Sequence, residues 1–328
     1  MNRRPWKNRW LVVAGFLLSA IFLWLAFRRV SAQTLATAFS NIRPFYVLVC
    51  AGSLLAGVLL RALRWRVVSG QPPAQQREFA RATNLGVLAN LIFPARAGEF
   101  VRVMTLGRRL RVPLAMPVAS ASFDRLIDVI VLVASASVLY YILPVSEALG
   151  RLLQSLLAVG CVIAIALVLY ARSAGVGAEF ISRITVWLLR RWPLDPEAFL
   201  SELRREFRRL IHGWLSVEVV LVAMLVLCAD YGAVAALLRA FDLSLPLEAP
   251  LALWVFLAAG SALPSAPGYV GVYQVAAVWA LSSYSVSAPV AVAVATVLQV
   301  ATLAVALLMA GPSAFSIFRQ TFSGRRMA

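Results

Sequence analysis

The sequence predicts an all-α, polytopic integral membrane protein, and three observations carry that prediction. Hydrophobic residues fill 62% of the 328 positions, and charged residues fill only 14%. The mean hydropathy is +0.84, whereas a soluble domain of this size carries about 25% charged residues. Several apolar runs also approach the roughly 20 residues that a helix needs to cross a bilayer. Much of the chain must therefore face lipid.

Six apolar runs predict about six full spans. The first follows a basic N-terminal stretch that resembles the start of a signal peptide, but Arg28 and Arg29 lie between the run and any small-residue cleavage site. We therefore predict an uncleaved signal anchor. The runs are Trp10–Phe27, Pro44–Leu60, Val112–Leu143, Leu149–Tyr170, Gly213–Leu238 and Pro289–Gly311.

The basic residues predict the orientation. With the N-terminus in the cytoplasm, 23 of the 31 basic residues fall on the cytoplasmic side and 5 on the opposite side. By the positive-inside rule both termini are cytoplasmic, and we expect a bacterial inner (plasma) membrane. The net charge of +17 is scattered between apolar runs, so it predicts loop topology and contact with anionic lipid, and not nucleic-acid binding.

The polar stretch 171–212 predicts one amphipathic cytoplasmic helix. Asp195 and Pro196 form a helix start, an N-cap residue followed by proline at the first position. Two readings stay open: a helix lying on the anionic leaflet, or a helix docked on the protein. Its predicted apolar face is Phe199, Leu203, Phe207 and Leu210, and its predicted basic faces carry Arg204, Arg205, Arg208 and Arg209.

Two hydrophobic segments, 84–106 and 249–285, are interrupted near their middle. In each, a proline is followed four positions later by a glycine: Pro94 and Gly98, Pro264 and Gly268. The predicted topology brings the two segments in from opposite faces, which is the pattern of inverted repeats with a binding site near the midplane. The halves would be about 44–143 and 213–311 of a single transmembrane domain. The alternative is coincidence, because proline and glycine interrupt many membrane helices. The predicted breaks and hinges are Pro94, Gly98, Pro264, Pro267, Gly268 and Gly271.

Charged residues at membrane depth are the second signal of a site. They are costly there, so they should face inward and pair. Asp124 and Asp128 lie one helical turn apart on one face. Two interpretations stay open: an ion-pair network that only fixes the first hairpin, or a site for an anionic headgroup or a coupling proton. The residues concerned are Arg96, Glu99, Arg102, Asp124, Arg125 and Asp128.

Arg61, Arg64 and Arg66, with Trp65, follow the second run. Interfacial anchoring with snorkelling side chains is one interpretation, and contact with a lipid phosphate is the other. The sequence contains no Ser–His–Asp set, HExxH, P-loop or glycine-rich fingerprint before a strand, and its three cysteines lack metal-ligand spacing. We therefore expect no cofactor, no metal and no enzymatic activity.

Four segments, in this order, resemble the transmembrane region of the lysylphosphatidylglycerol synthase family, also described as flippase-like. They are Arg61-Ala-Leu-Arg64-Trp65, Pro94-Ala-Arg96-Ala-Gly98-Glu99-Phe-Val-Arg102, Asp124-Arg125-Leu-Ile-Asp128 and Pro264-Ser-Ala-Pro267-Gly268-Tyr-Val-Gly271. The resemblance covers nearly the whole chain. It implies movement of an aminoacylated phospholipid across the bilayer. In the bifunctional synthases a separate soluble domain makes that lipid, and this chain has no such domain before its last residue, Ala328.

The residues and the resemblance together predict a stand-alone lipid translocase. Arginines 96, 102 and 125 would hold the phosphate of a phospholipid or lipid-linked substrate, and the three acidic residues would orient them or accept a cationic headgroup. Arg61, Arg64, Tyr269, Tyr273 and Gln274 complete the predicted substrate path; some family members carry glutamate in place of Gln274. Two alternatives remain: a lipid-modifying transferase that uses Glu99 or Asp128 as a base, and an accessory that recruits a lipid synthase or glycosyltransferase.

Overall fold

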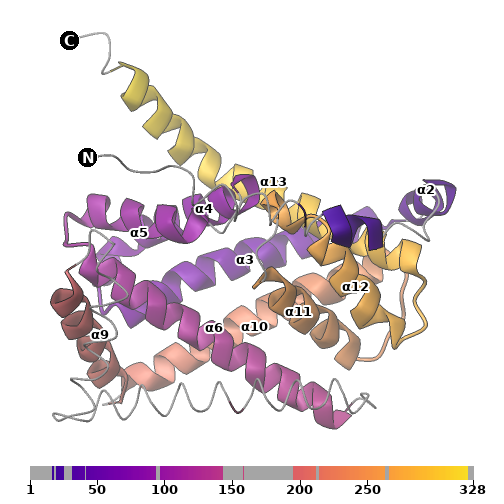
Figure 1. Ribbon diagram of the computed structural model, residues 1–328, viewed down its shortest axis with the longest axis horizontal. Coiled ribbons are helices and arrows are strands. Elements are labelled where there is room, and N and C mark those ends of the chain that lie inside the picture. Colours follow the sequence, from indigo (N-terminus) through magenta and orange to yellow (C-terminus); the bar gives the residue numbers. More distant parts are fainter. Residues whose placement is uncertain are drawn as a thin grey trace. The chain divides into compact units, whose positions relative to one another are not determined.

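The computed structural model describes residues 17, 20–25, 32–40, 42–93, 97–142, 158, 195–211, 214–262 and 266–323. Within these residues every regular element is a helix (Figure 1), as the fold-class prediction requires. The α-helices are α2 (Ala32–Ser40), α3 (Pro44–Val68), α4 (Gln76–Ile92), α5 (Ala97–Leu110), α6 (Ala115–Ile142), α9 (Pro196–Ile211), α10 (Trp214–Ala240), α11 (Glu248–Ser261), α12 (Val272–Ser282) and α13 (Ala288–Ser323). Two 3-10 turns, η1 (Pro73–Gln75) and η2 (Pro267–Tyr269), precede α4 and α12.

Four of the described helices are long and apolar enough to cross a membrane. Their apolar portions are Pro44–Val68, Ala115–Ile142, Val217–Ala240 and Ala288–Ala310, and they match four of the predicted spans. The predicted run Leu149–Tyr170 and most of Trp10–Phe27 lie outside the described residues. The two largest boundary differences from the prediction are that α3 continues eight residues past Leu60 and that α13 continues past Gly311 to Ser323.

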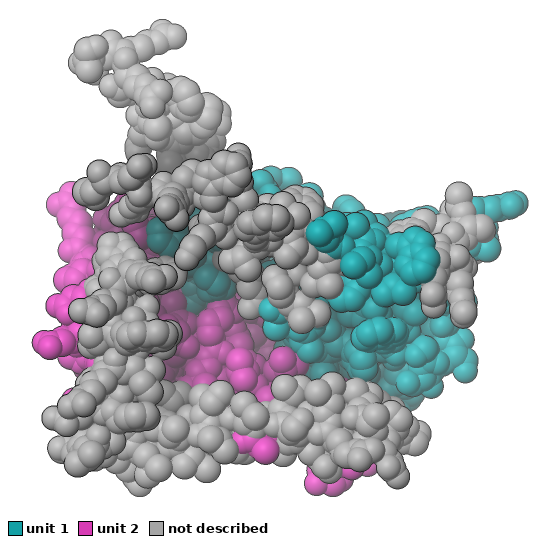
Figure 2. Space-filling view, viewed as in Figure 1, with its two compact units in different colours: residues 1–58, 83–102, 228–328 teal, residues 59–82, 103–227 magenta. Residues whose placement is uncertain are grey.

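The described residues form two compact units that alternate along the chain (Figure 2). Unit 1 comprises residues 1–58, 83–102 and 228–328, and unit 2 comprises residues 59–82 and 103–227. The unit boundaries fall inside helices α3, α4, α5 and α10. Each unit therefore contains parts of the same helices.

Unit 1 is built on small and branched apolar residues. Leu237 of α10, Leu253 of α11 and Leu281 of α12 are buried together in its main cluster, with Cys50 of α3. Helix α13 contributes the run Ala291–Ala295, whose side chains are almost completely buried. Without a hydrophobic driving force between helices in lipid, such small residues let helix backbones approach closely and gain contact energy.

Unit 2 has an aromatic centre. Trp65 of α3 and Phe79 of α4 pack edge to face, with ring centroids 5.1 Å apart, against Leu106 of α5 and Ala121 of α6. The indole N–H of Trp65 donates to the hydroxyl of Ser120, 3.0 Å away. Trp65 is completely buried, so it is a core residue and not the interfacial one that the anchoring interpretation predicts.

Helix α9 is docked on unit 2. Asp195 caps it as predicted, because its carboxylate accepts the N–H groups of Glu197 and Ala198. The helix packs against α6, and Arg209 donates to the carbonyls of Ser69 and Gly70 that follow α3. The docked-helix alternative is therefore the one that the structure supports. On the predicted apolar face, Phe199 and Leu203 are half-buried, and the buried Leu200 and Glu206 lie at the two edges of that face.

Candidate lipid-binding site

The first interrupted segment is a helix–break–helix hairpin. Helix α4 ends at Ile92 and α5 begins at Ala97, so the predicted interruption is confirmed, although Pro94 and Arg96 themselves lie outside the described residues. The two helices meet at glycines. A methyl group on Gly98 would overlap the carbonyl oxygen of Gly86, and one on Gly86 would lie 2.9 Å from Cβ of Arg102.

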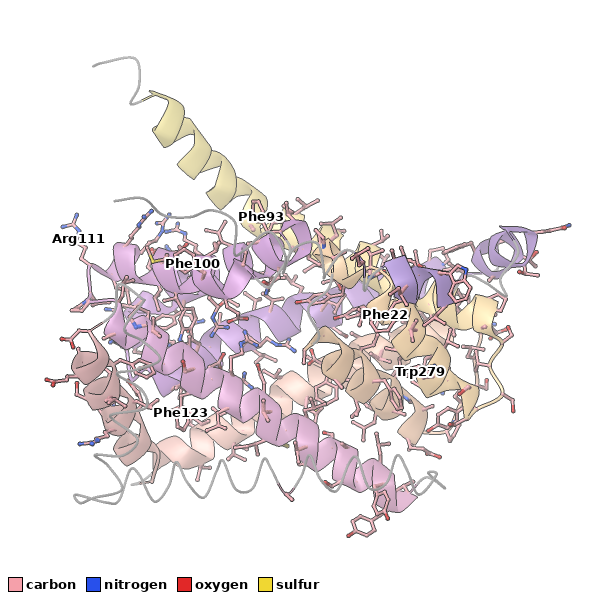
Figure 3. The ribbon with its side chains drawn as sticks, viewed as in Figure 1. Phe22, Phe93, Phe100, Arg111, Phe123 and Trp279 are labelled. Atoms are coloured by element: carbon pink, nitrogen blue, oxygen red, sulfur yellow. The ribbon has the colours of Figure 1, made fainter. Side chains whose placement is uncertain are left out.

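An amide side chain satisfies the backbone at this break. The first N–H groups of a helix have no partner within the helix, and in a membrane they must find one elsewhere. The N–H of Gly98, in the first turn of α5, donates to Oδ1 of Asn90 at 2.8 Å. Next to it, the carboxylate of Glu99 lies 3.6 Å from Nε of the buried Arg102. Phe93 and Phe100, labelled in Figure 3, lie on either side of the break, and each side chain is more than half exposed.

The second interrupted segment is also a hairpin. Helix α11 ends at Ser261 and α12 begins at Val272, with η2 between them; Pro264 lies outside the described residues. Gly268 and Gly271 adopt positive φ angles of 68° and 87°, a conformation that glycine adopts without steric cost. Tyr269 has a positive φ as well, and its ring stacks on that of Tyr273 with centroids 5.1 Å apart. Of the predicted hinges, Gly268 and Gly271 therefore lie where the backbone turns.

Two glutamines tie this second break to α13. The N–H of Gly271 donates to Oε1 of Gln274 at 2.8 Å, and Nε2 of Gln274 donates to Oε1 of Gln299 at 2.6 Å. Nε2 of Gln299 in turn donates to the carbonyl of Gly268 at 2.8 Å. Gln274 thus acts as both acceptor and donor. This use of the amide accounts for a glutamine here, because an ionised glutamate has no proton to donate to Gln299.

The two breaks meet inside unit 1. A methyl group placed on Gly268 would lie 3.5 Å, an ordinary contact distance, from the carbonyl oxygen of Leu91 in the last turn of α4. Leu91 and its helix also pack on α13, where Leu85 and Leu88 contact Ala306 and Ala310. The predicted juxtaposition of the two interrupted segments is therefore present between the last turn of α4 and η2.

Unit 2 holds a buried ion network. Nε of Arg64 lies 2.8 Å from Oδ1 of Asp124, and its Nη2 lies 2.5 Å from Oδ1 of Asp128. Arg64 and Asp124 are each about 1% exposed, while Asp128 is partly exposed and also pairs with Arg125 at 2.6 Å. The expectation that the two aspartates share one helix face is confirmed, since both reach the same guanidinium.

The predicted site residues fall into two groups, one in each unit. The snorkelling interpretation is wrong for Arg64, because α3 continues past this residue and its side chain is buried in the core of unit 2. Arg125 pairs with Asp128, one turn along the same helix, at 2.6 Å. In unit 1 lie Glu99, Arg102, Tyr269, Tyr273 and Gln274, and in unit 2 lie Arg61, Arg64, Asp124, Arg125 and Asp128.

Sequence reasoning missed three polar residues that support these groups. Asn90 follows Gly86 by one helical turn, so both lie on the face that meets α5. Gln299 stands alone as a large polar side chain in a long apolar run, which in a membrane helix is itself a functional signal. Ser120, bonded to Trp65, carries no comparable signal, because serine is common in packed membrane helices. Among the described residues, no group of three or more His, Cys, Asp or Glu side chains is placed to hold a metal ion.

Comparison with known proteins gives a family match over most of the chain. The sequence model of a family described as the lysylphosphatidylglycerol synthase TM region matches residues 12–310. A glycosyltransferase, AglD of Haloferax volcanii, is 26% identical over 133 residues. That match covers 40% of this chain and 21% of the glycosyltransferase, so the chain spans only about a fifth of that relative. No solved structure matches the chain.

Proposed function

Because this chain belongs to the family of lysylphosphatidylglycerol synthase transmembrane regions, we propose that it moves a phospholipid or a lipid-linked molecule between the two leaflets of a membrane. The multi-pass membrane assignment rests on the family and on the apolar helices. The finer proposal, translocation without chemical change of the lipid, rests on the two hairpins. We further propose that the membrane is a bacterial inner membrane and that both termini are cytoplasmic, as the basic residues predict.

The meeting of the two breaks is the observation that carries this proposal. The part of α4 that follows its last charged residue, Arg81, is residues 82–92 and rises about 16 Å at 1.5 Å per residue. The 14 residues of α11 rise about 21 Å. Both lengths are less than the roughly 30 Å of hydrocarbon. Hairpins of this length that start on opposite faces reach each other near mid-depth. Irregular backbone is stable at that depth only against protein or a wet cavity. A polar headgroup needs the same surroundings to cross.

The charged residues supply complementary chemistry. Arginine matches the geometry of a phosphate with its planar fork of donors. Arg64 is held on two sides by Asp124 and Asp128, so we assign it a structural role. Arg125 is 42% exposed and is better suited to meet a lipid phosphate. In unit 1, Arg102 is buried beside Glu99, so it would meet a phosphate only as the hairpins move.

Glycines at both breaks would allow the hairpins to move as lipid passes. Gly268 and Gly271 occupy conformations that side chains rarely adopt, and Gly98 permits the closest approach of α5 to α4. The sequence has no P-loop, so we propose that transport is downhill or coupled to an ion gradient. The lipid tails would stay in the bilayer throughout.

A vesicle assay tests the proposal. The purified chain is reconstituted into phosphatidylglycerol-containing vesicles that carry a headgroup-labelled phosphatidylglycerol in both leaflets, and an impermeant reagent quenches the outer leaflet. We expect protein-containing vesicles to lose the protected half of the signal at least tenfold faster than empty vesicles. Arg125→Gln should slow this loss at least tenfold, whereas Arg43→Gln, which removes a surface ion pair with Asp242, should not. Equal rates with and without protein, for labelled and for native lipid, would refute translocation.

A second candidate has one observation in its favour. The match to part of a glycosyltransferase favours an accessory that presents a lipid-linked substrate to a separate transferase. That candidate predicts co-purification with such an enzyme and no lipid movement by the chain alone. A lipid-modifying enzyme, in contrast, predicts a lipid of altered mass that disappears in Glu99→Gln or Asp128→Asn while the protein remains folded. A translocase leaves every lipid mass unchanged.

A further inference from the structure

Unit 1 contains a cavity that takes no part in the two hairpin tips. It has a volume of about 450 Å³, within the range of about 300–1,000 Å³ that is typical of small-molecule sites. The first turns of α3, the last turns of α10 and the connection into α11 bound it. The residues used below are Phe45, Val49, Gly232, Ala235, Arg239 and Leu247.

The walls of this cavity are apolar and continue onto a surface that suits lipid. Phe45 is 69% exposed and Leu247 is 81% exposed, and Val49 lies on the outer face of a helix long and apolar enough to span a membrane. Exposed apolar residues on such a helix face hydrocarbon. Apolar cavities tend to stay dry and to accept apolar ligands, and in a bilayer the apolar ligand at hand is an acyl chain.

The mouth of the cavity carries an exposed arginine, and hydrogen bonds fix the loop around it. Arg239, in the last turn of α10, is exposed and has no ion-pair partner among the residues that the structure describes. Around it, the N–H of Arg43 donates to the carbonyl of Ala240 at 2.9 Å, and Arg43 pairs with Asp242 at 2.9 Å. The hydroxyl of Tyr231 donates to the carbonyl of Leu247 at 2.8 Å. These bonds hold the loop in place, so the cavity does not depend on a ligand for its shape.

We propose that this cavity binds one bilayer phospholipid of anionic headgroup, with an acyl chain between Phe45 and Leu247 and the phosphate on Arg239. An arginine at the mouth of an apolar cavity matches the two parts of such a lipid, a charged phosphate and an apolar tail. The site is separate from the translocation path, because neither break and no member of the ion network lines it. It holds a resident lipid whether or not the chain moves others between leaflets.

Lipid retention during purification, measured by native mass spectrometry, tests the assignment. The wild-type chain is exchanged from phosphatidylglycerol vesicles into a mild detergent, and bound phosphatidylglycerol is counted. Gly232 lines the cavity, and a Cβ there would have only the Ser53 hydroxyl within 4 Å, at 3.5 Å, so Gly232→Phe places its ring in the cavity. We expect this variant to carry one phosphatidylglycerol fewer than wild type. Ala235→Leu, which fills the cavity less severely, should give the same loss and serves if Gly232→Phe does not fold.

Matched controls separate the cavity from general effects of substitution. Gly52→Phe adds the same side chain to α3 where no atom lies within 4 Å, and it should keep the full lipid count. Arg239→Gln should lower the preference for phosphatidylglycerol over phosphatidylcholine at least fivefold, whereas Arg111→Gln, at an exposed arginine of unit 2 that does not line the cavity, should not. The assignment is overturned if both cavity-filling variants keep the wild-type lipid count, or if Gly52→Phe loses the same lipid. An unchanged preference in Arg239→Gln would overturn the placement of the phosphate.

Discussion

Arg64 and its two aspartates show how charge is held inside an apolar helix bundle. A buried charge is costly unless it is paired and its remaining hydrogen-bonding groups are satisfied. Here one guanidinium meets two carboxylates and also the backbone carbonyl of Asp124, at 3.4 Å. These contacts between Arg64 and the two aspartates fix the orientation of α6 against α3 within unit 2. Its removal should therefore affect folding as well as function.

Substitution of one buried partner should be strongly destabilising. Asp124→Asn leaves a guanidinium that is 1% exposed without its fully buried carboxylate partner, and the loss of one partner of a buried pair costs about 3–5 kcal/mol. Asp242→Asn, which breaks the exposed pair with Arg43, should cost less than about 1 kcal/mol. The unfolding temperature in detergent measures both. Equal small decreases in the unfolding temperature of the two variants would show that the buried pair contributes no more to stability than the exposed pair.

Glu206 predicts a pH dependence of the α9 contact. Its side chain is completely buried, and burial raises its pKa from 4.5 to about 7, against the opposing effect of Arg209 and Arg205. Between pH 4.5 and 7 the folded state then binds more protons than the unfolded state, so stability falls as the pH rises through this window. The loss is complete above pH 7.

Two glutamate variants test this fall in stability with rising pH. Glu206→Gln removes the ionisation, so it should raise the unfolding temperature at pH 8 more than at pH 5. Glu197→Gln changes an exposed carboxylate in the first turn of the same helix, and its effect should be small and equal at the two pH values. A Glu206→Gln shift that is the same at pH 5 and pH 8 would contradict the assignment.

At the scale of elements, the α4–α5 hairpin depends on two facing glycines. Any side chain on Gly98 meets the side-chain amide of Asn90 and the backbone carbonyl of Gly86, and the carbonyl cannot rotate away. Gly98→Leu should therefore force α5 away from α4 and destabilise the chain by about 1–3 kcal/mol or more. Gly52→Leu enters open space and should have almost no effect on the unfolding temperature. Lipid movement should be lost only in Gly98→Leu.

The second hairpin depends on Gln299 of a different helix. Gln299→Leu leaves the carbonyl of Gly268 and the amide of Gln274 without the partners described above, at a cost of about 1–3 kcal/mol for each buried polar group. Thr302→Val removes a hydroxyl that bonds only to its own helix, at the carbonyl of Leu298, and should cost less. A lower unfolding temperature for Gln299→Leu than for Thr302→Val checks this. The reverse order would mean that α13 does not hold the break.

Across the whole chain, the sequence predicted structure correctly where hydrophobic run length, or the backbone preferences of single residues, decide it. Run length predicted four of the described spans, proline and glycine predicted both breaks, and Asp195 predicted a helix start. It was less informative where partners are distant in sequence. The arginines that follow Leu60 have the composition of an interfacial anchor, and only the longer helix α3 shows that Arg64 reaches Asp124. The partners of the broken backbone, Asn90 and Gln299, are set by tertiary contact in the same way.

Lipid movement between the two hairpins requires both breaks to lie at a similar depth in the bilayer. Spin labels on cysteines at Phe93 and at Val270, both exposed beside a break, report depth when Cys50, Cys161 and Cys228 are replaced by alanine. Relative accessibility to oxygen and to a water-soluble nickel complex in reconstituted bilayers gives that depth. We expect both labels near the bilayer midplane, and a label at Phe100, one turn into α5, to lie nearer one face. Labels at Phe93 and Val270 that report opposite membrane surfaces would contradict the account.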